Sequence, residues 1–192
     1  WADVEVRIPD TPFDVQVSPD GTRIAVAGHV PDVYLWSRSG EPLGVWKGHS
    51  GSVPCLAWSP DGALLASGGS DGDVRVWRDG TSFVLHGHLS EPTRYSFTRD
   101  SEWIVAGDRE AVAMQLDTGT CQANSIKGAM APGPKGPEVY VAEAGRLMVV
   151  DVQEGSTYLD VNLAGIRDPG GIDSSPDGRA LVVSGSWSCA PR

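Results

Sequence analysis

The sequence predicts an all-β fold made of repeated four-stranded antiparallel units, and three repeating features support this. A Ser-Pro-Asp-Gly turn recurs at residues 18–21, 59–62 and 175–178, with a degraded copy, Thr-Arg-Asp-Ser, at 98–101. The first two copies lie 41 residues apart, as do Trp36 and Trp77. The Gly-His pairs at 48–49 and 87–88 lie 39 residues apart. Repetition at one period indicates units that must bury their apolar faces against one another.

Local chemistry favours short strands joined by tight turns. Val74 and Val76 alternate with charged neighbours, which is typical of a strand with two different faces. In the recurring turn, Pro presets φ, Asp accepts local hydrogen bonds and Gly tolerates positive φ. The sequence shows no sustained helical period.

A period of about 40–45 residues, opened by Gly-His and closed by Trp, is typical of a propeller blade. On these residues the chain resembles the WD40 family of β-propellers, most closely over residues 48–80. The Trp-Asp dipeptide itself is missing, because Trp36 precedes Ser37 and Trp77 precedes Arg78. The resemblance implies an all-β, WD40-like β-propeller. About four four-stranded antiparallel blades would form an incomplete arc, with partial blades at both ends.

We expect a single propeller domain over residues 1–192. It would hold an outer strand of a preceding blade at 1–10, blades at 11–47 and 48–86, degenerate blades at 87–126 and 127–165, and a partial blade at 166–192. Apolar alternation in the first blade predicts strands at Phe13–Val17, Arg23–Ala27, Val33–Trp36 and Leu43–Trp46. In the second it predicts Val53–Trp58, Leu64–Ser67, Val74–Trp77 and Phe83–Leu85. The third should contain Thr93–Phe97, Trp103–Ala106, Val112–Leu116 and Cys121–Ile126.

The last two repeats are less regular. Residues 128–136 are rich in Pro and Gly, which predicts a distorted inner strand or an inserted loop before Val139–Ala142, Leu147–Val150 and Tyr158–Val161. The final repeat supplies only Gly171–Ser174 and Ala180–Ser184. Such an arc would leave an apolar blade face uncovered. We favour a fragment of a longer propeller over a five-bladed ring completed by Val4–Ile8 or pairing between two copies.

Composition narrows the functional classes. A net charge of −10 argues against nucleic-acid binding, which needs clustered Lys and Arg. The sequence contains no apolar run long enough for a membrane span. Its three cysteines form neither a zinc spacing nor a disulfide framework, and Cys55 is expected to be a small buried residue. We therefore expect a cytoplasmic protein with no cofactor and no metal.

By resemblance to the family, His49, Ser67, Asp71 and Trp77 should form a buried hydrogen-bond set that links Trp to Ser, Ser to His and His to Asp. A buried indole N–H and a buried imidazole both need partners. The alternative is a Ser-His-Asp nucleophilic triad. We prefer the structural interpretation, because the residues fit the repeat and no G-x-S-x-G elbow is present. His86 and His88 could supply half of a metal site, but His88 belongs to the repeated Gly-His pair.

The resemblance also implies that partner peptides bind where the inner strands begin and in the turn after the second strand of each blade. Projection of these positions gives Thr11, Phe13, Ser52, Pro54, Ser70, Glu91, Thr93, Arg109 and Asp168. We therefore expect a non-enzymatic protein–protein interaction scaffold or sensing module. Its partner would be a protein or peptide, or the missing blades of its own parent chain. The alternative is a small-ligand-binding or hydrolytic β-propeller enzyme domain, which would need polar groups converging on the innermost strands.

Overall fold

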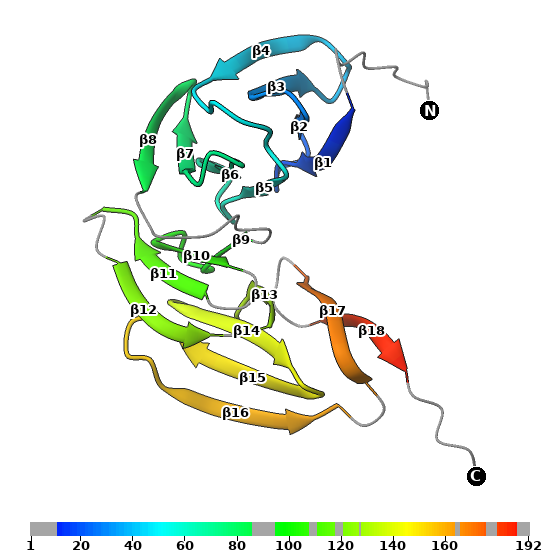
Figure 1. The fold of residues 1–192 in the computed structure, drawn as a ribbon, viewed down its shortest axis with the longest axis vertical. Coiled ribbons are helices and arrows are strands. Elements are labelled where there is room, and N and C mark those ends of the chain that lie inside the picture. The colour runs from blue at the N-terminus through cyan, green and yellow to red at the C-terminus, as the bar shows by residue number, and fades with distance from the viewer. Residues whose placement is uncertain are drawn as a thin grey trace. The chain divides into compact units, whose positions relative to one another are not determined.

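The computed structural model describes residues 11–85, 95–107, 111–117, 121–126, 128–163, 166–175 and 180–187. These residues form strands and turns without any helix, so this part of the chain contains no helix that could cross a membrane. Four four-stranded antiparallel sheets and one two-stranded sheet follow one another along the chain (Figure 1). The predicted all-β, WD40-like fold class is confirmed. The strand expected within residues 1–10 lies outside the described residues.

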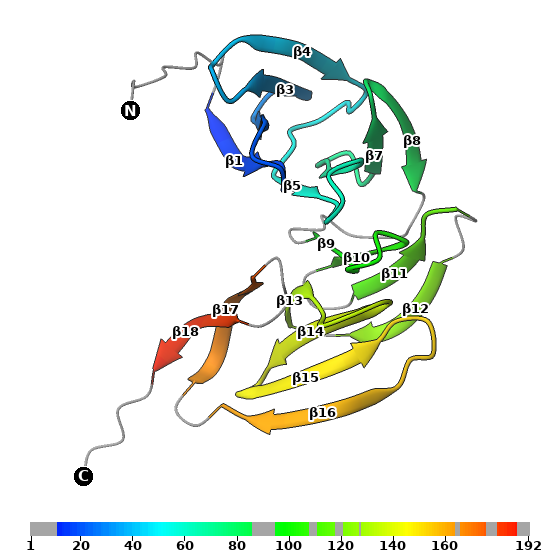
Figure 2. The same ribbon diagram turned by 180° about the vertical axis from the view of Figure 1, so that it is seen from behind.

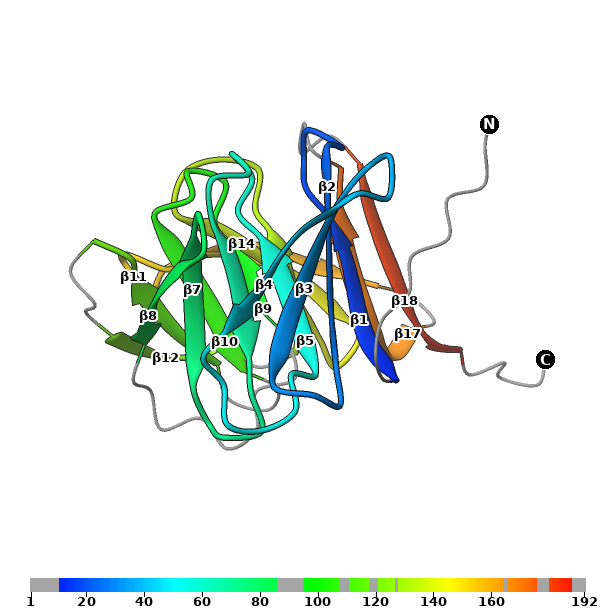
Figure 3. The ribbon, with the colours of Figure 1, turned by 90° about the horizontal axis from the view of Figure 1, so that it is seen from above.

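The chain divides into two compact units, Trp1–Thr93 and Arg94–Arg192. The first unit holds two sheets, whose strands run alongside one another in sequence order (Figure 3). One sheet contains β1 (Pro12–Val17), β2 (Arg23–Gly28), β3 (Asp32–Ser37) and β4 (Pro42–Lys47). The other contains β5 (Cys55–Trp58), β6 (Leu65–Gly68), β7 (Val74–Arg78) and β8 (Thr81–Leu85). Whether both units form one propeller domain stays a prediction.

The core of the first unit lies between its two sheets. Small and branched side chains of β2 and β3 pack against larger ones of the next repeat, and the buried cluster comprises Ala25, Ala27, Val33, Leu35, Val53, Leu56, Leu65 and Trp77. Polar contacts also join the sheets. The Leu56 N–H donates to Asp14 Oδ2 at 2.7 Å, and Arg23 lies 4.6 Å from the centre of a Trp58 ring. Each sheet thus stabilises its neighbour, as the repeat predicts.

The second unit holds the remaining three sheets (Figure 2). The first contains β9 (Tyr95–Phe97), β10 (Trp103–Gly107), β11 (Ala111–Gln115) and β12 (Cys121–Ile126). The second contains β13 (Ala129–Pro132), β14 (Glu138–Glu143), β15 (Arg146–Asp151) and β16 (Thr157–Asn162). The last pairs β17 (Ile166–Ser174) with β18 (Leu181–Trp187). A buried cluster of Trp103, Val105, Ala113, Met130, Val139, Val141, Val150 and Val152 joins the first two sheets.

Two details differ from the sequence-based expectations. The Pro/Gly-rich stretch forms a short, regularly paired inner strand, β13, whose Pro residue stands last. The final strand, β18, continues to Trp187, past the predicted end at Ser184. Cys55 is buried, as expected.

The recurring turns owe their shape to their aspartates and glycines. Asp20 accepts hydrogen bonds from Ser18 Oγ at 2.5 Å and from the Thr22 N–H at 3.0 Å. Led by the Ser18 hydroxyl, these bonds lower the pKa of Asp20 to about 2. Gly21 has φ of +70° and Gly62 has φ of +72°, conformations that favour glycine. In the degraded copy, Ser101 occupies the glycine position at φ of +61°.

Candidate functional site

Four polar side chains of the first unit meet in one hydrogen-bonded chain. Trp77 Nε1 donates to Ser67 Oγ at 2.7 Å. Ser67 Oγ lies 2.8 Å from His49 Nε2, and His49 Nδ1 lies 3.1 Å from Asp71 Oδ1. Ser67 comes from β6 and Trp77 from β7, whereas His49 and Asp71 lie in the loops before β5 and after β6. The structure therefore brings together all four residues that the sequence placed in this set.

The loops around this set are held by backbone groups. The Ser50 N–H donates to Asp71 Oδ2 at 2.8 Å, and the Asp73 N–H donates to Asp71 Oδ1 at 3.1 Å. Gly69 lies directly against the set, because a Cβ atom there would overlap Asp71 Oδ1 and His49 Nδ1. The second glycine of the Ser-Gly-Gly segment is thus required by packing. The sequence shows two consecutive glycines in this segment, but it does not show why the second one, Gly69, is needed.

The network defines the protonation state of His49. A buried Ser67 hydroxyl that accepts from Trp77 donates in turn to His49 Nε2, which leaves the imidazole proton on Nδ1 to be donated to Asp71. Burial lowers the pKa of His49 below the ordinary 6.5 and outweighs the opposing effect of Asp71. Partial burial acts to raise the pKa of Asp71, but the N–H groups of Ser50 and Asp73, together with His49, lower it. A neutral imidazole beside a carboxylate therefore fits the geometry.

The same distances resemble those of a nucleophilic triad, but the position of Ser67 does not suit that chemistry. Ser67 is 0% exposed, and its oxygen already accepts the Trp77 N–H. A nucleophile must reach the substrate atom that it attacks. Ser67 Oγ is therefore closed to a substrate, and the internal hydrogen bonds use its O–H and one of its two acceptor positions.

A second group of residues gathers at the loop end of the first unit, which we call the rim. It comprises His29 and five residues predicted from the sequence: Thr11, Phe13, Ser52, Pro54 and Ser70. Backbone hydrogen bonds connect its loops, from the His29 N–H to the Thr11 carbonyl (3.1 Å) and from the Ser70 N–H to the Ser52 carbonyl (2.8 Å). Ser52 Oγ also donates to Ser70 Oγ at 3.1 Å. The Val53 N–H donates to the Gly28 carbonyl at 2.8 Å, which joins the two halves of the rim.

Phe13 is the most prominent apolar residue of the rim. It is 52% exposed, and its ring meets the His29 ring edge-on, with 6.2 Å between centroids. Sequence reasoning missed His29. It stands 41 residues before Ser70, so the repeat spacing that links Thr11 to Ser52 and Phe13 to Pro54 would have found it.

Of the other predicted contact residues, only Asp168 lies in the part of the chain that the structure describes. Glu91, Thr93 and Arg109 lie outside the described residues, as do His86 and His88. Asp168 lies in β17, opposite Ser186 of β18. The described residues contain no cluster of three or more His, Cys, Asp or Glu side chains that could hold a metal ion.

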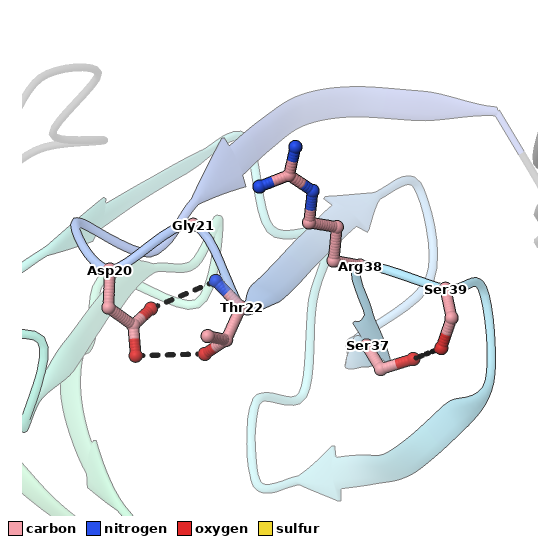
Figure 4. A pocket seen from close by; sticks show the side chains of 6 residues that line it. All are labelled: Asp20, Gly21, Thr22, Ser37, Arg38 and Ser39. Atoms are coloured by element: carbon pink, nitrogen blue, oxygen red, sulfur yellow. Dashed lines mark hydrogen bonds between the residues drawn. The ribbon is translucent and has the colours of Figure 1, made fainter. Parts of the chain in front are cut away.

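An open depression of about 420 Å³ lies at the turns of the sheet β1–β4, formed by residues 20–22 and 37–39 (Figure 4). Its polar groups largely bond one another. Asp20 accepts from Thr22, and the hydroxyl groups of Ser37 and Ser39 lie 2.8 Å apart. Asp20 and Arg38 give the depression groups of both charges, without a convergent set for one ligand.

Comparison with known proteins finds a family match that contains the hydrogen-bonded set of the first unit. The family described as "WD domain, G-beta repeat" matches residues 40–78. Protein ROOT INITIATION DEFECTIVE 3 of Arabidopsis thaliana is 35% identical over 82 residues, which cover 40% of this chain and 19% of that protein. Serine-threonine kinase receptor-associated protein of Dictyostelium discoideum is 38% identical over 77 residues, covering 38% of this chain and 26% of that protein.

The 66 kDa stress protein of Physarum polycephalum is 31% identical over 107 residues, which cover 52% of this chain and 18% of that protein. The matched regions thus span about a fifth to a quarter of the length of these relatives. The family match includes His49, Ser67, Asp71 and Trp77, and the same four-stranded arrangement recurs in the sheets before and after it. Residues 40–78 therefore match a WD40 repeat.

Proposed function

We propose that this chain is a non-enzymatic platform for protein–protein interaction, with the rim of its first unit as a contact surface. The observation that carries the proposal is the division of roles in this unit. The residues with catalytic character are buried or partly buried and bonded to one another, whereas the Phe13 ring at the start of β1 and hydroxyl groups of the adjoining loops lie at the surface. Exposed aromatic residues on loops over a rigid scaffold are typical of protein recognition.

The relatives support the same class of function. WD40 repeats serve as protein-interaction modules, and one relative is named a serine-threonine kinase receptor-associated protein. The partner of this chain would be a protein or peptide that covers Phe13 and hydrogen-bonds to the rim hydroxyls. The negative net charge of −10 favours a basic partner surface. A cytoplasmic location remains a prediction from cysteine usage.

Affinity enrichment from a cell extract, quantified by mass spectrometry, tests this proposal. Phe13→Ser should lose partners that the unchanged chain retains. Leu43→Ser is the matched control, because Leu43 is equally exposed, at 53%, but lies on β4 away from the rim. Equal loss in both variants would refute the rim as a contact surface. Ester hydrolysis that disappears in Ser67→Ala while the fold persists would instead favour the hydrolytic alternative.

A further inference from the structure

The outermost strand of the sheet β13–β16 is exposed along its whole length. β16 pairs only with β15 in the order β13-β14-β15-β16, and it forms the outer border of its sheet (Figures 1 and 2). All six of its residues are exposed. Within the described residues, no other strand pairs with its outer edge. An edge of this kind carries backbone groups that can template another strand.

The hydrogen bonds of β16 show which backbone groups point outward. The Leu163 N–H donates to the Gly145 carbonyl at 2.7 Å, so residue 163 points toward the neighbouring strand. Backbone direction alternates along an antiparallel strand. The N–H and C=O groups of Asp160 and Asn162 therefore point away from β15. Together they offer two donors and two acceptors in the spacing of a strand ladder.

The side chains of β16 lack the features that usually block strand addition. The outer strand β4 begins with Pro42 and ends with Lys47, both of which hinder edge pairing. β16 contains neither residue type. Its one charged side chain, Asp160, is bound by Nε and Nη2 of Arg146 on β15.

The apolar side chains of β16 are also exposed. Leu159 and Val161, which are 39% and 43% exposed, share one face of the strand, since alternate residues point to the same side. Tyr158, at 54%, is exposed as well. An added strand could therefore cover apolar area in addition to forming backbone hydrogen bonds.

The charge near β16 indicates what kind of strand would bind. Residues 129–162 contain five acidic and two basic side chains, and the chain as a whole carries −10. Two copies of this chain would repel each other, whereas a basic segment would be attracted. Charge thus favours a basic partner over self-association.

We propose that β16 accepts an extended, basic segment of a partner protein as a fifth strand of the sheet β13–β16. The segment would alternate apolar residues, which cover Leu159 and Val161, with Lys or Arg residues. Its backbone would pair with the outward groups of Asp160 and Asn162, as in other cases of strand addition. The inference rests on the proposed interaction function and adds a second surface, separate from the rim.

The test uses the 192-residue chain and a fluorescein-labelled peptide, Lys-Val-Lys-Val-Lys-Val-Lys, blocked at both ends. Fluorescence anisotropy should show saturable binding. Asn162→Pro removes an outward N–H without removing a ladder bond to β15, so it should weaken binding about fivefold, the equivalent of one hydrogen bond. Asn162→Ala keeps that N–H and should bind normally. Val161→Lys should also weaken binding, whereas Val45→Lys should not, since Val45 is similarly exposed, at 44%, but lies on β4.

Two further measurements separate strand addition from simple charge attraction. A peptide with the same charge but proline in place of each valine should not bind. Hydrogen exchange at the amides of Asp160 and Asn162 should slow when the valine peptide binds. Equal binding of both peptides, or unchanged exchange at both amides, would overturn the inference. If Phe13→Ser abolishes partner enrichment while the valine peptide fails to bind, the proposed function stands and this inference fails.

Discussion

Replacement of Trp77 by phenylalanine tests the hydrogen-bond set most specifically. Trp77 is 1% exposed and stacks on Trp46, with 5.6 Å between ring centroids. The substitution removes the N–H that donates to Ser67 and leaves part of a buried site empty. A buried polar group without its partner costs about 1–3 kcal/mol. A residual cavity of about 40 Å³ would cost roughly 1 kcal/mol more. We therefore expect Trp77→Phe to lower the free energy of unfolding by about 2–4 kcal/mol.

The repeat provides a matched control in Trp36, which is also buried and stands 41 residues earlier. The position equivalent to Ser67 in this earlier repeat is Val26, whose side chain has no acceptor. Trp36→Phe therefore removes ring volume but no equivalent hydrogen bond. Urea unfolding followed by circular dichroism would measure both variants. Trp77→Phe should cost about 1–2 kcal/mol more than Trp36→Phe, and equal costs would refute the argument.

Three further predictions follow from the same region and from the recurring turns. Gly69→Ala should destabilise the chain by about 1–3 kcal/mol in urea unfolding, because its Cβ would overlap His49 and Asp71; a change no larger than that of Ser70→Ala would contradict this. Ser101→Gly should stabilise it by about 0.5–1 kcal/mol, since φ of +61° suits glycine; a lower melting temperature would count against it. Because the folded pKa of His49 is lowered, the unfolded chain binds the extra proton first, so stability should fall as pH drops below about 6.5. The Asp71 pKa is also lowered, which adds a further loss near the acid range where its carboxylate becomes protonated. His49→Gln should flatten the first of these losses, and an unchanged slope would show that another group causes it.

Much of the fold could be predicted from the sequence because the turns carry strong local signals. Every strand predicted between Phe13 and Val161 has a counterpart in the structure, usually longer or shorter by one or two residues. Ends were harder to predict, since pairing with a neighbouring strand can extend a segment beyond its apolar pattern. β18 is an example, because it pairs with β17 as far as Trp187.

The candidate site was predictable to the extent that its residues follow the repeat. His49, Ser67, Asp71 and Trp77 stand at recognisable positions, and the structure joins them by hydrogen bonds. The requirement for Gly69 was not predictable, because it depends on how closely two loops approach. The exposed edge of β16 was not predictable either, because the sequence of a strand does not show whether a neighbouring strand covers it.

A double-mutant cycle tests whether the polar set serves as an internal hydrogen-bond network. The measurement compares the unfolding free energies of Ser67→Ala, Trp77→Phe and the double variant with that of the unchanged chain. If Ser67 and Trp77 bond each other in the core, the costs should be non-additive by about 1 kcal/mol or more, because either change alone breaks the same bond. Additive costs would contradict the account.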